Sequence, residues 1–123
     1  MTVSDRLPFD LVISEEQGCQ VFHLRGRLMD QQQADRLMAA LDEQLTKGHK
    51  YVVLDMSELQ YMNSTGLNIL INVLTGTRKA GGDTFIAGVS SSVRQLFIVT
   101  KLDTVFNMTD DVPSAVARIN SPA

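Results

Sequence analysis

Hydrophobic and polar positions alternate along the start of the chain and then change to helical spacing at Asp30. The alternation predicts strands over residues 9–14 and 19–28, and the polar segment EEQG between them is typical of a hairpin turn. Beyond Asp30 the apolar residues recur every three or four positions, with Asp30 as the N-cap and Gly48 as the stop. We therefore predict an antiparallel strand pair followed by an amphipathic helix.

The next segment combines a buried strand with a second helix. The apolar run YVVLDM at residues 51–56 predicts a strand that is covered on both faces. In the helix that follows, we place one apolar side toward the core, and the paired glycines at 81–82 end it. That side comprises Leu67, Leu70, Ile71 and Leu74.

The last third of the chain repeats this alternation. TFIAGV at residues 84–89 predicts a buried strand, and the serines at 90–92 offer N-caps for a helix through VRQLFIVTKL. A short strand near VFNMT and a last helix near PSAVARI follow, with Pro113 in the first helical turn.

Strands that alternate with helices predict an α/β fold. We expect a mixed, mostly parallel β-sheet of about five strands, with an antiparallel N-terminal edge hairpin and about four helices. A chain of 123 residues suits a single domain, which we take as 1–123 with a core over residues 8–119.

Composition excludes several classes of function. The net charge of −3, with lysines and arginines scattered singly, argues against nucleic-acid binding. Cys19 is the only cysteine, which excludes an internal disulfide and fits a reducing cytoplasm. Neither a signal peptide nor an apolar run long enough to span a bilayer is present, so we expect a soluble, cytoplasmic protein without membrane contact.

Enzymatic chemistry is difficult to build from this sequence. His23 falls in a predicted strand and His49 in a turn, so nothing pairs either histidine with Ser64 as a nucleophile. No His, Cys, Asp or Glu group has the spacing of metal ligands. The segment AGG follows a helix, so it does not resemble a phosphate-binding loop. We expect no catalytic residue, metal or cofactor.

The polar segment NSTG at residues 63–66 lies where the third strand meets the second helix. One interpretation is that Asn63 or Ser64 only caps the helix. The other begins from the helix N-terminus, which favours negative charge, so that a phosphate on Ser64 would be tolerated and would act as a switch. Residue types alone leave both interpretations open.

The same helix offers a candidate binding face beside Ser64. If the four core residues named above face inward, a rotation of about 100° per residue turns a second set outward. We predict that this set comprises Thr65, Asn68, Ile69, Asn72 and Val73. Ile69 and Val73 would then either form an apolar docking patch or lie beneath a neighbouring helix.

Three segments resemble one known family in order and spacing. VVLDMSELQYMNSTGLNIL resembles the signature of the STAS domain family, particularly the bacterial anti-sigma-factor antagonists. KAGGDTFIAGVSSSVRQLFIVTKLDTVFNMTDD continues the resemblance, and GRLMDQQQADRLMAALDEQLTKGHK is similar to the family's first helix region.

The resemblance implies a partner switch. In such antagonists the unphosphorylated domain binds an anti-sigma factor that is also a GHKL-type serine kinase, and phosphorylation releases the complex until a PPM-type phosphatase restores it. By motif, Ser64 is the phosphoacceptor, Thr65 follows it, Gly66 allows the turn to pack closely, and Asp30 lies near the partner surface. We expect Asn63, Thr65 and Gly66 to take part in partner binding as well. ATP and magnesium would belong to the kinase, and we expect a free monomer that is not an enzyme.

Two features depart from the family pattern. Asn63 occupies a position where the family usually has aspartate, and one residue more than usual separates Gly26 from Asp30. An alternative that keeps the fold is a non-switching STAS scaffold subunit of a larger signalling or transport assembly. In that case Ser64 would only cap the helix.

Overall fold

The first two strands form a tight hairpin in the computed structural model, which describes residues 9–121. β1 (Asp10–Glu16) pairs antiparallel with β2 (Cys19–Leu28), and Gln17 and Gly18 connect them with φ of 52° and 85°. Positive φ at both central residues is typical of a type I′ turn, whose twist matches that of the strands. The turn is therefore shorter than the predicted EEQG segment, because both glutamates belong to β1.

The remaining strands extend the sheet in one direction. β3 (Tyr51–Met62), β4 (Asp83–Ala87) and β5 (Asn107–Thr109) follow β2 in the order β1-β2-β3-β4-β5. Every pair after the hairpin is parallel. This arrangement confirms the predicted α/β fold with its antiparallel edge hairpin. Residue 8 of the predicted core lies outside the described residues.

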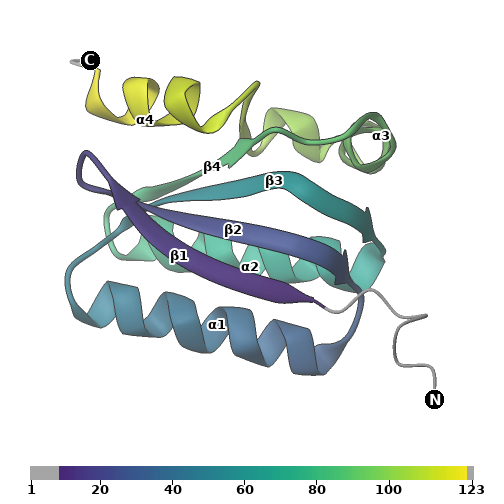
Figure 1. The fold of residues 1–123 in the computed structure, drawn as a ribbon, viewed down its shortest axis with the longest axis horizontal. Helices are drawn as coiled ribbons and strands as arrows, with labels where there is room; N and C mark the ends of the chain where they lie inside the picture. Colours follow the sequence, from purple (N-terminus) through teal and green to yellow (C-terminus); the bar gives the residue numbers. More distant parts are fainter. Residues whose placement is uncertain (1–8, 122–123) are drawn as a thin grey trace.

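Helices cover both faces of the sheet (Figure 1). α1 and α2 lie against one face, and α4 lies on the other. Because successive parallel strands are added on the same side, right-handed crossovers carry their helices to a common face. The bounds are α1 Gln31–Thr46, α2 Ser64–Lys79, α3 Ser91–Val99, α4 Val112–Asn120 and a short 3-10 turn, η2, Leu102–Thr104.

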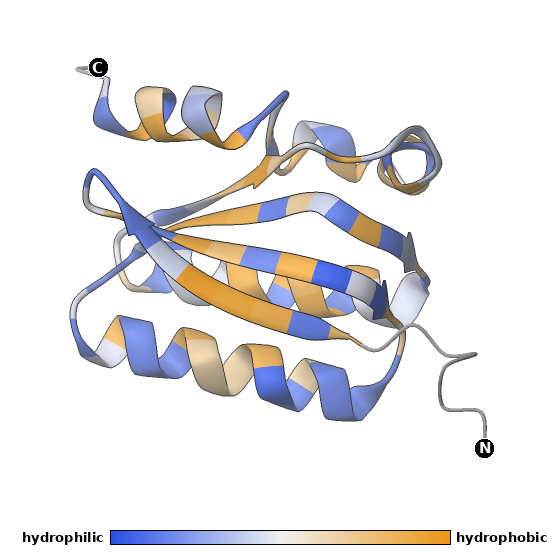
Figure 2. Ribbon diagram, viewed as in Figure 1, coloured by the Kyte–Doolittle hydropathy of each residue, from blue (hydrophilic) through white to orange (hydrophobic). Residues whose placement is uncertain are grey.

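Two hydrophobic clusters fill the space between these layers. The larger one joins the sheet to α1, α2 and α3, and the smaller one lies under α4. Representative members are Leu37, Leu54, Leu70 and Phe97 in the larger cluster, and Val21, Val53, Phe85 and Ala115 in the smaller one. Figure 2 shows β3 beginning in a hydrophobic stretch and becoming mixed toward its C-terminal end. The larger cluster fixes α2 on the sheet.

β3 is longer than the sequence pattern predicts. We expected a strand over residues 51–56, but β3 continues to Met62, with irregular pairing to β2 on either side of Arg25. These bulges interrupt the alternation, since Ser57 and Glu58 are both exposed. The longer strand brings the chain directly to Asn63, where α2 begins.

Side-chain caps begin the four α-helices as the sequence pattern suggests. Asp30, Asn63, Ser90 and Asp111 each accept a hydrogen bond from the backbone N–H three residues later. Within residues 9–121, none of these helices is long and apolar enough to cross a membrane. The described part of the chain also holds no cluster of three or more potential metal ligands.

Candidate functional site

The starts of α1 and α2 lie at one edge of the sheet, where β2 and β3 end (Figure 1). Parallel strands that are joined by helical crossovers bring their carboxyl ends, and the helix N-termini that follow, to a common edge. Asp30 caps α1, and Asn63 caps α2. Two of the predicted partner-binding residues therefore occupy equivalent positions in neighbouring units of the fold.

Asn63, and not Ser64, is the N-cap of α2. Its Oδ1 accepts a hydrogen bond from the Gly66 N–H at 3.0 Å. Ser64 is the first residue of the helix and is exposed. Because the cap is supplied by its neighbour, the Ser64 hydroxyl is available to a reaction partner without loss of the cap.

Gly66 allows the first turn of α2 to pack against the end of β2. A Cβ at this position would collide with the carbonyl oxygen of Leu28 and with the side chain of Met62. Gly66 is itself buried, so it can shape the site but presents little surface to a partner.

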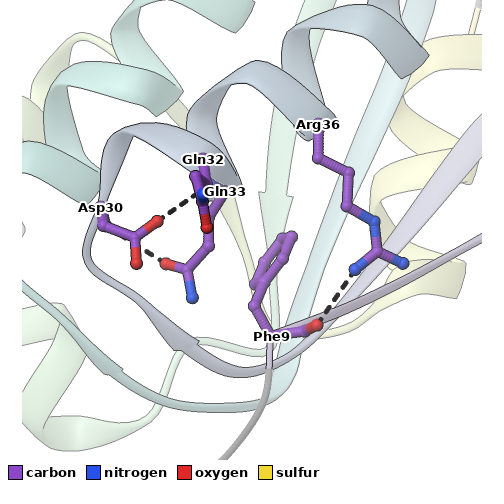
Figure 3. A pocket seen from close by; sticks show the side chains of 5 residues that line it. All are labelled: Phe9, Asp30, Gln32, Gln33 and Arg36. Atoms are coloured by element: carbon purple, nitrogen blue, oxygen red, sulfur yellow. Dashed lines mark hydrogen bonds between the residues drawn. The ribbon is translucent and has the colours of Figure 1, made fainter.

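Asp30 is exposed at the start of α1 and takes part in a capping box. Its Oδ1 accepts from the Gln33 N–H at 3.0 Å, while Gln33 Oε1 accepts from the Asp30 N–H at 3.2 Å. A shallow hollow of about 230 Å³ adjoins it, with Phe9 on one side and Arg36 donating to the Phe9 carbonyl at 3.1 Å (Figure 3). The Asp30 carboxylate is therefore fixed at the rim of an open, polar surface.

A second, larger hollow lies directly beside Ser64. It measures about 420 Å³ and is formed by the end of β3, the first residues of α2, and α3. Its lining residues are Tyr61, Met62, Asn63, Ser64, Ser92, Gln95, Leu96 and Val99. Tyr61 is 47% exposed and Val99 is 67% exposed, so the hollow has an apolar rim next to the hydroxyl.

The helical pattern left open whether Ile69 and Val73 form an apolar patch on α2 or lie beneath a neighbouring helix. Thr65, Asn68 and Asn72 are exposed as expected, but Ile69 and Val73 are only 3% and 0% exposed, so these two form no apolar docking patch. The buried residues of α2 span an arc of roughly 160° when drawn at 100° per residue.

α1 lies against the side of α2 that carries Ile69 and Val73. A Cβ added at Gly76, which shares that side, would lie 3.1 Å from Leu41 Cδ2. The structure therefore favours the second alternative, that a neighbouring helix covers Ile69 and Val73, and that helix is α1. The predicted core stripe of Leu67, Leu70, Ile71 and Leu74 therefore covers only part of the buried surface of α2.

His23 is hydrogen-bonded on both ring nitrogens, but not to Ser64. Its Nδ1 lies 2.7 Å from Asp55 Oδ2, and its Nε2 lies 2.9 Å from Ser14 Oγ. Since an ionised carboxylate only accepts hydrogen bonds, Nδ1 donates to Asp55, and Nε2 pairs with the Ser14 hydroxyl, which can donate or accept. These three side chains connect β1, β2 and β3 across the sheet, and Ser64 takes no part.

Hydrogen bonding changes the acidity of Asp55. Burial alone would raise its pKa, but the backbone and side-chain donors of Ser57, together with His23, outweigh burial and lower the pKa. Ser57 donates its N–H at 3.1 Å and its hydroxyl at 2.8 Å. The ionised carboxylate is therefore favoured in the folded chain. By contrast, burial raises the pKa of the Cys19 thiol, with Glu16 adding to the effect, so this cysteine stays protonated.

Comparison with known proteins gives consistent matches over most of the chain. The model of the STAS domain matches residues 10–115. The putative anti-sigma factor antagonist BtrV of Bordetella bronchiseptica is 27% identical over 111 residues, which cover 90% of this chain and 95% of that protein.

Two solved structures share the fold. An anti-sigma factor antagonist from Mycobacterium paratuberculosis has a TM-score of 0.81 at 20% identity, over 93% of this chain and 96% of the other. The Bacillus cell fate determinant SpoIIAA in its phosphorylated form has a TM-score of 0.70 at 19% identity, over 92% of this chain and all of the other. The order of elements, the capped start of α2 and the family match agree, and the chain belongs to the STAS domain family.

Proposed function

We propose that this chain is an anti-sigma-factor antagonist that works by partner switching. In the unphosphorylated form it binds an anti-sigma factor, and phosphorylation of Ser64 releases it. The observation that carries the proposal is the exposed Ser64 hydroxyl, at the first position of α2 and on the edge of a hollow with an apolar rim. The names of BtrV and the Mycobacterium paratuberculosis protein support the role, and the phosphorylated form of SpoIIAA supports the modification.

Phosphorylation at Ser64 would change the charge of the surface without unfolding the domain. A phosphate adds about −1.5 to −2 charge at neutral pH. The free N–H groups and the dipole at the start of α2 favour such a charge. Because Asn63 already supplies the cap, phosphorylation would remove no hydrogen bond that begins the helix.

Release would follow from the cost of burying that charge. A partner that docks over the hollow would cover Tyr61 and Val99, which are apolar and exposed, together with Ser64. Removing an unpaired phosphate from water is costly, whereas removing a neutral hydroxyl costs much less. The same apolar rim that favours docking therefore makes the phosphorylated form a poor partner.

The proposed docking surface has three parts. The hollow beside Ser64 supplies the apolar part, and the exposed Thr65, Asn68 and Asn72 of α2 continue it with polar groups. Asp30 supplies a negative charge at the start of α1. We assign no direct contact to the buried Ile69 and Val73, which support the surface from below.

In this proposal the catalytic activities belong to the partners. We propose a GHKL-type serine kinase as the anti-sigma factor, which would hold ATP and magnesium, and a PPM-type phosphatase that removes the phosphate. The chain itself would be a cytoplasmic regulator and not an enzyme.

A set of serine variants tests this proposal through the dissociation constant of the complex with the kinase. Ser64→Glu should raise that constant by roughly tenfold or more, which corresponds to about 1.4 kcal/mol. Ser64→Ala should bind at least as tightly as the natural chain and should resist release by ATP. Ser114→Glu, which places the same charge in the exposed first turn of α4, is the matched control and should bind normally. Equal binding by all three variants would contradict the switch and favour the scaffold alternative.

A further inference from the structure

The side-chain amide of Asn63 makes two hydrogen bonds that join different parts of the chain. Its Oδ1 accepts from the Gly66 N–H at 3.0 Å and caps α2. Its Nδ2 donates to the Met29 carbonyl at 3.3 Å, in the segment between β2 and α1. An ionised carboxylate at the same position accepts the first bond equally well, but it has no hydrogen to donate to Met29.

The segment that receives this second bond is already tied to α1. Gln33 Oε1 accepts from the N–H groups of Met29 and Asp30, at 2.6 and 3.2 Å. The N–H groups of the segment therefore face α1, while the Met29 carbonyl faces the start of α2. Close packing of Gly66 against the Leu28 carbonyl adds a contact, but it supplies no directional bond.

We infer that Asn63 is a positioning residue that fastens the Met29–Asp30 segment to the first turn of α2. Through this bond, Asp30 and Ser64 are held in one fixed arrangement before any partner arrives. The bond itself is a property of the free chain, and only its consequence for docking rests on the proposed function. A surface that is already ordered loses less conformational entropy on binding, so the partner meets both residues together.

Replacement of the amide by a carboxylate separates this role from capping. Asn63→Asp keeps an equally good cap and adds a negative charge that the start of α2 favours. It also removes the donor and places a carboxylate against the Met29 carbonyl oxygen. The start of α2 should therefore stay as ordered as before, while the segment before α1 becomes less ordered.

Amide hydrogen exchange in the free, full-length chain measures both effects. In Asn63→Asp, amides over residues 28–33 should exchange roughly fivefold faster, as expected for loss of one hydrogen bond of about 1 kcal/mol. Amides in the first turns of α2 should not exchange faster. Asn68→Asp is the matched control, because it makes the same charge change at an exposed residue of the same helix. The control should leave residues 28–33 unchanged.

The pH dependence of the variant tests the mechanism. Below its pKa the introduced carboxyl gains a proton and can again donate to Met29. The exchange ratio of Asn63→Asp to the natural chain, compared at equal pH, should therefore return toward one on acidification. Asn63→Ser retains a capping oxygen but lacks the amide donor, so its ratio should stay high at every pH. A general loss of stability would give both variants the same profile.

The outcomes separate this inference from the proposed function. Normal exchange over residues 28–33 in both Asn63 variants would overturn the positioning role, whatever happens at Ser64. If exchange accelerates as described but the kinase leaves Ser64 unmodified, the positioning role stands and the proposed switch fails.

Discussion

The start of α2 divides its tasks among neighbouring residues. Asn63 caps the helix, Ser64 presents its hydroxyl, and Gly66 allows the turn to approach β2. One residue could not serve two of these roles, since a hydroxyl that caps the helix is occupied and a side chain at position 66 has no space. Ser64 can therefore remain exposed because Asn63 caps the helix and Gly66 makes the close contact with β2.

Gly66→Ala should destabilise the fold, because the new Cβ would meet the Leu28 carbonyl and the Met62 side chain. We expect a loss of about 1–3 kcal/mol in the free energy of unfolding, as for other overpacked sites. Urea denaturation measures this quantity.

Gly76→Ala is the control in the same helix. Its Cβ would lie 3.1 Å from the flexible end of Leu41, and alanine favours a helix over glycine by up to about 1 kcal/mol. This variant should be close to the natural chain in stability. Equal stability of the two variants would contradict the close approach at Gly66.

Some residues of the site could be predicted from the sequence, and others could not. Asp30 was predictable as a cap because capping depends on residue types and local spacing. Tyr61 and Val99 were not, because their proximity depends on the length of β3 and the placement of α3. The sequence could not decide whether Ile69 and Val73 form a docking patch or lie beneath a neighbouring helix, because helical periodicity does not reveal how many neighbours a helix has.

At the scale of elements, β3 and α3 form the hollow. β3 extends past its predicted end at Met56 through irregular pairing with β2, which places Tyr61 beside the N-terminus of α2. Bulges of this kind break the alternation on which strand prediction depends. The type and order of the elements followed from periodicity, whereas this extension depended on pairing across the sheet.

A substitution on α3 tests whether the hollow is a docking surface. Val99→Glu should weaken kinase binding by roughly tenfold, because it places a charge on the apolar rim. Val99 is 67% exposed, so the free energy of unfolding should change by no more than about 0.5 kcal/mol. Calorimetric titration and urea denaturation measure the two quantities.

The adjacent Ile98 provides the control. It is 45% exposed on the same helix but does not line the hollow. Ile98→Glu should leave kinase binding nearly unchanged. If both variants weaken binding equally, the apolar rim is not the specific docking surface that we propose.

At the scale of the whole molecule, a network of hydrogen-bonded side chains links three strands. Ser14, His23 and Asp55 lie on β1, β2 and β3, and Ser57 adds two further donors to Asp55. Because folding lowers the pKa of Asp55, the ionised Asp55 carboxylate stabilises the folded state. This stabilisation is fully present above the unfolded pKa of about 3.9, and it is lost as the pH falls through the lower folded pKa.

Asp55→Asn should therefore lower the free energy of unfolding at neutral pH by about 1.5–3 kcal/mol, the range for hydrogen bonds to a charged group. The difference from the natural chain should shrink as the pH falls below 3.9, approximately the unfolded pKa. Urea denaturation over a pH series measures it, with the exposed Asp42→Asn as control. A constant difference at all pH values would show that the charge of Asp55 does not contribute.

The most direct test of the proposed switch is the intact mass of the chain, with site mapping, after incubation with the GHKL-type kinase and Mg-ATP. We expect a single phosphate on Ser64 and loss of co-elution with the kinase. Binding without phosphorylation, or a phosphate at any other residue, would contradict the switch.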